Sequence, residues 1–169
     1  DIWYYGTLSR SAWIDSDLRE NPMAATYSNN LVNHEVGYDN QESATASAIT
    51  ATLLSSEFDL DDGDRFMFVN RVLPDVTFEG STVTNPAAVM TLSPMQNSGS
   101  GYNNPLSVGG NSASTVTRTA TVPIEEFTGQ VFVRLRGRQM AFKVESTELG
   151  VAWKLGIPRL EMRADGRRG

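Results

Sequence analysis

The chain has 169 residues, a formal net charge of -6 and no cysteine. The lack of cysteine excludes disulfides, thiolate metal sites and cysteine nucleophiles. A hydrophobic share of 40% with 9% aromatic residues is ordinary for a globular protein and argues against wholesale disorder. No apolar run approaches the roughly 20 residues of a membrane-spanning helix, so we expect no membrane span.

The charge is unevenly distributed. Residues 1–130 carry 5 basic and 16 acidic side chains, whereas residues 131–169 carry 9 basic and 4 acidic side chains. Only Lys143 and Lys154 of the basic residues are lysines. Arginine favours bidentate, partly buried pairing over a merely solvated surface. The acidic majority counts against a free DNA-binding domain, which usually carries net positive charge.

The sequence of residues 1–45 predicts short aromatic strands separated by tight turns. The stretches "WYYGTLSRSAWIDSD" and "PMAATYSNNLVNHEVGYD" are typical of one β-propeller blade or of a β-meander. A single blade cannot bury its own faces, and the sequence begins at Asp1 in a strand-like stretch. We therefore expect this segment to be a remnant of a longer polypeptide with upstream neighbours. The polar stretch "DNQESATAS" (39–47) predicts a loop and a domain boundary.

Residues 46–163 predict an antiparallel, jelly-roll-like β-sandwich, because period-two apolar alternation recurs and no sustained helical period is present. We expect strands within residues 49–60, 66–78, 87–94, 114–123 and 130–146, and a broken strand from 150 onward. Pro74 indicates an edge position or a bulge. Residues 93–114 predict a long exposed loop, and residues 164–169 a basic C-terminal tail.

For two of these stretches, the alternation predicts which side chains share a face of the sheet. In the first, one face is expected to hold Phe66, Phe68, Val72, Val76 and Phe78. In the second, Val131, Val133 and Leu135 oppose Phe132, Arg134 and Arg136, and Met140, Phe142 and Val144 then face the core. Gly137 predicts a bulge or bend between these two alternations. Beyond it, Val151, Trp153 and Leu155 share a face, followed by Leu160 and Met162 after Pro158.

The acidic stretch "DLDDGD" holds Asp59, Asp61, Asp62 and Asp64. Calcium loops place Asp at alternate positions before a glycine, but one loop supplies too few of the six to eight ligands that Ca²⁺ takes. A tight turn in which aspartates accept backbone N–H groups explains the stretch better, and calcium remains the alternative. His34, the only histidine, cannot build a zinc site from this chain alone. We expect no metal site and no cofactor.

Catalytic signals are weak. Glu125 and Glu126 are adjacent, so on a strand they point to opposite faces and cannot flank one glycosidic bond. No serine lies in a strand-to-helix elbow, and no glycine-rich loop precedes a helix. We therefore expect a protein that is not an enzyme. A polysaccharide lyase or hydrolase would instead need a cleft with two converging carboxylates.

Arginines are the candidate interface residues. Arg134, Arg136 and Arg138 recur at alternate positions, about 6 to 7 Å apart by strand rise if they share a face. Such a row suits phosphates or carboxylates. Because aspartates are abundant upstream, we favour ion pairs within the chain or between subunits over a nucleic-acid stripe. We expect the basic members to be Arg71, Arg134, Arg136, Arg138 and Arg159, and the acidic members to be Asp59, Asp61, Asp62 and Asp64.

Two stretches carry a resemblance to a known family. "SSEFDLDDGDRFMFVNRVLPDVTFEGS" and "QVFVRLRGRQMAFKVESTELGVAWKLGIPRLEMRADGRR" resemble the C-terminal region of bacteriophage virion structural proteins of the tail tube or nozzle class (tail tubular protein B-like) of short-tailed and marine phages. The stretch "IWYYGTLSRSAWIDS" resembles one of the blade strands that precede that region. The five candidate arginines match recurrent arginines of the family, and Asp62-Gly63 matches its recurrent acidic turn.

The resemblance implies a structural role in the virion. Subunits of such a family form a ring, usually a hexamer, around the channel through which DNA leaves the particle. The implied partners are further copies of the chain, the adjacent adaptor and fibre proteins, and genomic DNA that passes without sequence-specific binding. An acidic wall repels phosphates and lets DNA slide.

The alternative function is a carbohydrate-binding β-sandwich of a receptor-binding or fibre-attachment protein. Six aromatic residues are candidate stacking platforms for sugar rings: Trp3, Tyr4, Tyr5, Trp13, Tyr27 and Tyr102. This alternative requires two or three aromatic side chains exposed together.

Overall fold

A computed structural model describes residues 8–16, 19–95 and 119–167. The regular secondary structure of these residues is almost entirely β-strand, and the sheets are antiparallel, which confirms the predicted all-β, sandwich-like fold. No helix among them is long and apolar enough to cross a membrane. The chain divides into two compact units, residues 1–48 and 49–169, slightly C-terminal of the predicted boundary.

The first unit is a small meander. Strands β1 (Ala12–Ile14), β2 (Met23–Ala25) and β3 (Leu31–Asn33) form one sheet, and β4 (Asp39–Asn40) pairs with β5 (Ser47–Ala48). The β2–β3 turn is closed by buried Thr26, whose N–H donates to the Asn30 carbonyl (2.9 Å) and whose hydroxyl accepts from the Asn30 N–H (3.2 Å). The unit therefore has the meander connectivity expected for residues 1–45.

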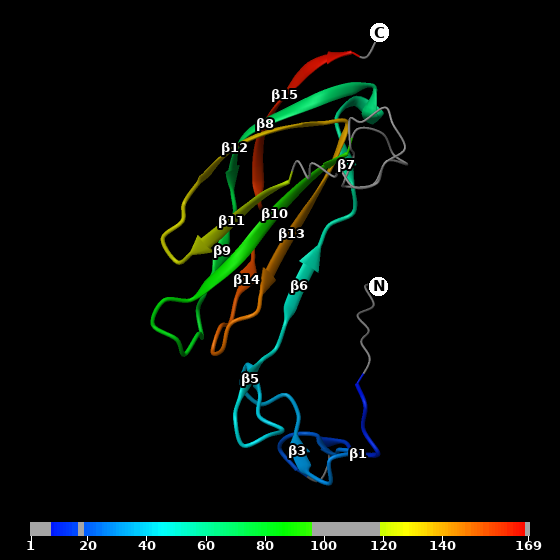
Figure 1. Ribbon diagram of the computed structural model, residues 1–169, viewed down its shortest axis with the longest axis vertical. Coiled ribbons are helices and arrows are strands. Elements are labelled where there is room, and N and C mark those ends of the chain that lie inside the picture. Colours follow the sequence, from blue (N-terminus) through cyan, green and yellow to red (C-terminus); the bar gives the residue numbers. More distant parts are fainter. Residues whose placement is uncertain (1–7, 17–18, 96–118, 168–169) are drawn as a thin grey trace, which may run out of the picture. The chain divides into compact units, whose positions relative to one another are not determined.

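The second unit is the sandwich (Figure 1). One sheet has the strand order β11-β10-β13-β6, formed by β6 (Ala51–Leu54), β10 (Ala87–Met95), β11 (Ala120–Glu125) and β13 (Gln139–Ser146). Strand β7 (Phe58–Asp59) pairs with β13 beside β6. We call this the five-stranded sheet.

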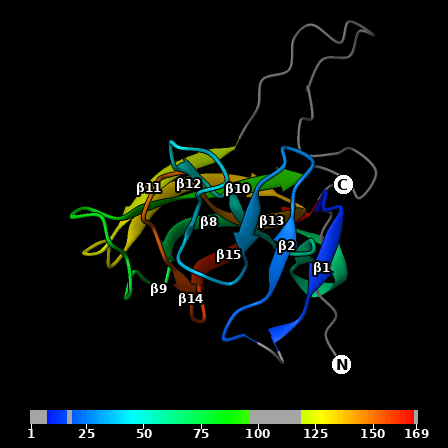
Figure 2. The same ribbon diagram turned by 90° about the horizontal axis from the view of Figure 1, so that it is seen from below.

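The opposing layer has β8 at its centre, and Figure 2 shows it from below. We call it the three-stranded sheet, with the order β12-β8-β15: β12 (Val131–Gly137), β8 (Arg65–Leu73) and β15 (Arg159–Arg167). The short strands β9 (Val76–Thr77) and β14 (Lys154–Leu155) form a separate pair. A 3-10 turn, η2 (Asp61–Gly63), connects β7 to β8.

The core lies between these two sheets. Met90 and Leu92 of β10 and Met140, Phe142 and Val144 of β13 form one wall. The other wall comprises Met67, Val69 and Val72 of β8 and Val131, Val133 and Leu135 of β12. Val151, Trp153, Leu155, Leu160 and Met162 also belong to or pack against this cluster, as predicted. Burial of these apolar surfaces supplies the main driving force for the fold.

Strand β8 departs from the predicted facing. Phe66 and Phe68 were expected on the face of Val72, but the core-facing residues are Met67, Val69 and Val72. The strand carries a bulge: Glu161 and Met162 of β15 are consecutive, yet they pair with Arg71 and Val69. The extra residue, Asn70, reverses the alternation and lets Val69 and Val72 both face inward.

Strand β12 follows its prediction, because its residues alternate strictly between buried and exposed positions up to Gly137. There the chain passes from the three-stranded to the five-stranded sheet. The Arg138 N–H donates to the Met95 carbonyl at 2.7 Å and fixes this corner. The predicted bend at Gly137 is therefore confirmed as a change of sheet.

Two predicted irregular segments are partly strand. β10 continues to Met95, so residues 93–95 are not loop, and residues 96–118 lie outside the described residues. β15 continues to Arg167, so most of the predicted tail pairs with β8. Gly166 has φ +79°, and the register shifts between Ala164 and Arg167, which allows the strand to bend and continue.

Candidate functional site

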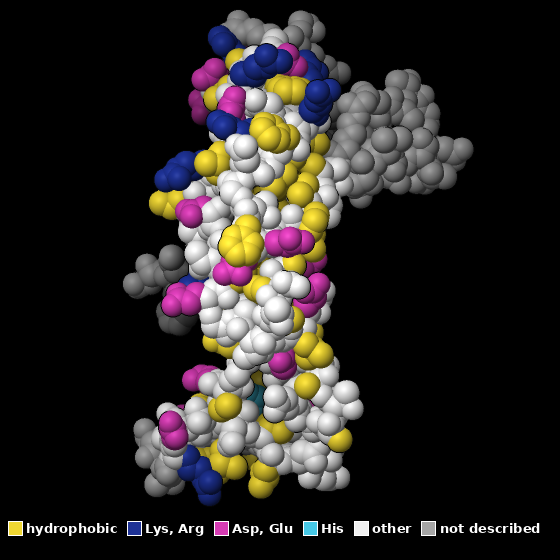
Figure 3. All heavy atoms as spheres, turned by 90° about the vertical axis from the view of Figure 1, so that its left-hand side faces the viewer, with side chains coloured by type: hydrophobic (Ala, Val, Ile, Leu, Met, Phe, Trp, Pro, Cys, Tyr) yellow, Lys and Arg dark blue, Asp and Glu magenta, His cyan; other side chains and the backbone are white. Residues whose placement is uncertain are grey.

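The outer face of the three-stranded sheet carries most of the predicted arginines. Phe132, Arg134 and Arg136 point outward from β12, opposite the buried Val131, Val133 and Leu135. Figure 3 shows basic side chains on the upper part of the second unit, next to acidic and hydrophobic side chains. The outer face of the three-stranded sheet therefore combines outward arginines with the exposed ring of Phe132.

Arg136 is held in place by three contacts. Its guanidinium donates from Nε to the Asp165 carboxylate and from Nη2 to the Asp165 carbonyl (3.0 Å), and it lies 4.1 Å from the centre of the Phe66 ring. The partner Asp165 lies on β15, downstream of Arg136, and not among the upstream aspartates that the sequence suggested. Two β-strands that flank β8 are thus joined across it.

A second ion pair lies on the same sheet. Arg71 Nη2 donates to Glu161 at 2.8 Å, and the Asn70 amide donates to the other oxygen of that carboxylate at 2.8 Å. The Asn70 hydrogen bond and the Arg71 charge lower the pKa of Glu161 below its ordinary value, because both favour the ionised carboxylate. Arg71 is therefore an intramolecular ion-pair residue.

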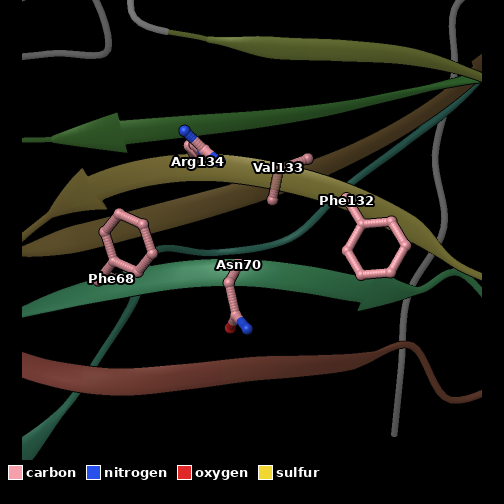
Figure 4. A pocket seen from close by; sticks show the side chains of 5 residues that line it. All are labelled: Phe68, Asn70, Phe132, Val133 and Arg134. Carbon is pink, nitrogen blue, oxygen red and sulfur yellow. The ribbon is translucent and has the colours of Figure 1, made fainter.

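Two adjoining hollows lie on this face, on either side of Phe68 and Asn70. The larger, of about 500 Å³, is lined by Phe68 and Asn70 of β8 and by Phe132, Val133 and Arg134 of β12 (Figure 4). The smaller, of about 270 Å³, is lined by Phe68, Asn70, Glu161, Met162 and Arg163. Arg163 of β15 lies over the Phe68 ring, with its guanidinium carbon 5.0 Å from the ring centre.

The remaining candidate arginines have separate positions. Arg134 is exposed, and the described residues offer it no hydrogen-bond or ion-pair partner. Arg138 is half-buried at the corner between sheets, 5.7 Å from the Phe66 ring, and its Nε has no partner in the described part of the chain. Arg159 is exposed at the start of β15. The row Arg134-Arg136-Arg138 is therefore broken at Gly137.

The acidic candidates form the turn between β7 and β8. Asp59 accepts from the Gln139 amide (3.3 Å), Asp61 pairs with Arg65 (3.5 Å), and the Asp64 N–H donates to the Asp61 carbonyl (3.1 Å). Asp62 and Gly63 both have positive φ, +54° and +74°, which fits a tight turn. Within the described ranges, no three His, Asp or Glu side chains are grouped to hold a metal ion.

His34 lies in the first unit. Its Nε2 accepts from Arg10 Nε at 3.1 Å, and its ring packs against Trp13 with centroids 4.7 Å apart. Arg10 also pairs with Glu42 at 3.4 Å. These contacts hold the meander together.

The aromatic candidates give a mixed result. Trp13 packs against His34 but is 47% exposed, and Tyr27 is 75% exposed, whereas Trp3, Tyr4, Tyr5 and Tyr102 lie outside the described residues. Glu125 and Glu126 are exposed at the β11–β12 turn, where the Glu125 N–H donates to the Thr128 hydroxyl.

Sequence reasoning missed the hollow-lining residues Phe68 and Asn70. The bulge at Asn70 moves Phe68 to the outer face, and the period-two pattern gives no sign of it. Phe132 could have been found, because it is an aromatic residue at an outward position two residues from Arg134.

Comparison with known proteins adds no assignment: no family model matches the chain, and no curated protein matches it.

Proposed function

We propose that the chain is a structural subunit of a bacteriophage tail, of the tube or nozzle class, which joins further copies of itself into a ring around the DNA exit channel and contacts neighbouring tail proteins. The proposal rests on the resemblance of residues 55–81 and 130–168 and on the open strand β6, one of the two edge strands (β6 and β11) of the five-stranded sheet. It assigns the chain to the virion and gives it a non-enzymatic role.

The open strand is the observation that carries the proposal. Strand β6 pairs with β13 on one side and, among the described residues, with no strand on the other. Such an edge presents unpaired N–H and C=O groups to another chain. Leu53 and Leu54 are 41% and 57% exposed, although Leu53 pairs with core-facing Val144 and so lies on the core side.

An edge of this kind suits a subunit contact. A strand from a neighbouring copy would complete the hydrogen-bond ladder of β6 and cover its two leucines. Because β6 would meet a different surface of the neighbour, the contact is heterologous, and a heterologous contact closes into a ring when the rotation allows it. In this proposal the paired arginines stiffen each subunit.

Light scattering and negative-stain electron microscopy of the purified full-length protein test this function. We expect a ring-shaped oligomer, and a monomeric globular particle would overturn the proposal. Leu54→Lys should reduce assembly, because charge on an open edge opposes strand pairing. Val89→Lys is the matched control, since Val89 is exposed on β10, a central strand of the same sheet.

A further inference from the structure

We propose that the larger hollow on the three-stranded sheet binds a saccharide that carries a carboxylate. This site is separate from the β6 edge and is independent of the proposed tail function. Its five lining residues come from two adjacent strands, β8 and β12. The volume of about 500 Å³ suits a ligand of one or two sugar rings.

The aromatic rings supply the apolar part of recognition. Phe132 is 72% exposed on the sheet, and Phe68 contributes a second ring to the same hollow from the neighbouring strand (Figure 4). Pyranose rings have faces of C–H groups that pack against aromatic rings, which removes apolar surface of both from water.

Arg134 supplies the charged part. The other arginines beside the two hollows are engaged within the chain: Arg136 with Asp165, and Arg163 over the ring of Phe68. Arg134 has no such partner among the described residues. A guanidinium recognises a carboxylate with two parallel hydrogen bonds, so a sugar acid lying on the rings would place its carboxylate there.

Asn70 supplies a neutral polar group. Its amide nitrogen donates to Glu161, so the amide is oriented and its carbonyl oxygen remains an acceptor for a sugar hydroxyl. The smaller hollow on the other side of Phe68 gives a neighbouring sugar residue a place on the same face.

The layout favours a small ligand over a protein segment. A stable protein interface covers about 800 Å² on each partner around an apolar centre. Here polar side chains separate the aromatic rings, and the ion pairs Arg71–Glu161 and Arg136–Asp165 flank them. The lining residues sit on paired strands, so a saccharide would lose little affinity to ordering of the site.

Tetragalacturonic acid is the probe, with maltotetraose as its neutral control and tetraglutamate as its peptide control. Binding to the full chain is measured by isothermal titration calorimetry and by shifts of the amide resonances. We expect the acidic saccharide to bind and to shift the resonances of Phe68, Asn70 and Phe132, with at least tenfold weaker binding of both controls.

Phe132→Ala and Arg134→Gln should each weaken binding at least tenfold. Phe127→Ala and Arg159→Gln are the matched controls, because both side chains are exposed and neither lines the hollow. Circular dichroism checks that each variant is folded. No binding of the acidic saccharide, equal binding of maltotetraose or tetraglutamate, or equal losses in the control variants would each overturn the proposal.

Discussion

Gly137 sits where the chain leaves one sheet and enters the other, and its surroundings leave no room for a side chain. A Cβ atom there would lie 2.9 Å from the Gln139 carbonyl oxygen, 2.9 Å from Pro94 Cβ and 3.1 Å from the Met95 carbonyl oxygen. Two of these neighbours are backbone atoms in the paired strands β10 and β13, which cannot yield by a change of rotamer.

Gly137→Ala is therefore expected to lower the free energy of unfolding by about 1–3 kcal/mol, as overpacking of a rigid site does. Urea unfolding followed by tryptophan fluorescence measures the change. Gly129→Ala is the control, since nothing lies within 4 Å of a Cβ there and its φ is not in the left-handed region. Equal stability of the two variants would contradict this account of the corner.

Glu161 gives a prediction about pH. Its pKa is lowered in the folded chain by Asn70 and Arg71, so these contacts stabilise the fold above the carboxyl's unfolded pKa. The contribution is lost as the pH falls through the lowered folded value. Asn70→Ala should raise the folded pKa of Glu161, as measured by carbon-detected NMR titration of the carboxyl.

Glu145 is the internal control for this titration. Its pKa is lowered mainly by hydrogen bonds from Lys143 and Thr52, which lie on the other sheet. The titration of Glu145 should stay unchanged in Asn70→Ala. A shift of Glu145 together with Glu161 would indicate a general disturbance of the fold.

Among the elements, strand β10 has one face in the core and the other on the outside of the five-stranded sheet. Met90 is fully buried against β13 and the opposing sheet, whereas its neighbour Val89 is 38% exposed on the outer side. Met90→Ala should destabilise the unit by about 2–5 kcal/mol, because the removed side chain leaves a cavity in a packed core.

Val89→Ala, one residue away, should change the unfolding free energy by less than about 0.5 kcal/mol. Thermal and urea unfolding of both variants measure the contrast. A loss at Val89 equal to that at Met90 would mean that the assignment of the two faces is wrong.

The sequence predicts the elements where the alternation is strict and fails where an extra residue interrupts it. β12 and β13 follow their patterns, so the outward Arg134 and Arg136 and the inward Met140 and Phe142 are predictable. In β8, the bulge at Asn70 exchanges the faces of Phe66 and Phe68 relative to Val72. The alternation could not predict the ion-pair partner of Arg136 either. That partner, Asp165, lies on β15, whose position is set by its pairing with β8 and not by local sequence.

At the scale of the whole molecule, the division at residue 48 predicts separable folding. Unit 49–169 contains both layers of the sandwich and its entire core cluster. A fragment of residues 49–169 should therefore fold alone and retain the main thermal unfolding transition of the full chain. Circular dichroism and calorimetry of the fragment, beside the full chain, test this expectation.

The fragment would contradict this division if it were unfolded or if its transition lay far below that of the full chain. Limited proteolysis offers a second measure, because a boundary between independent units is a preferred site of cleavage. Early cleavage is expected between β5 and β6.

The pairing of β15 with β8 sets an order for synthesis. During translation, β8 leaves the ribosome long before residues 159–167, yet β8 is the middle strand of its layer and needs them on one side. Until then that side of β8 is an unpaired edge, and chains halted in this interval are prone to associate with one another. A nonsense codon between positions 74 and 158 would thus yield a product whose β8 keeps an unpaired edge, prone to association, and which lacks the β15 residues that line the smaller hollow.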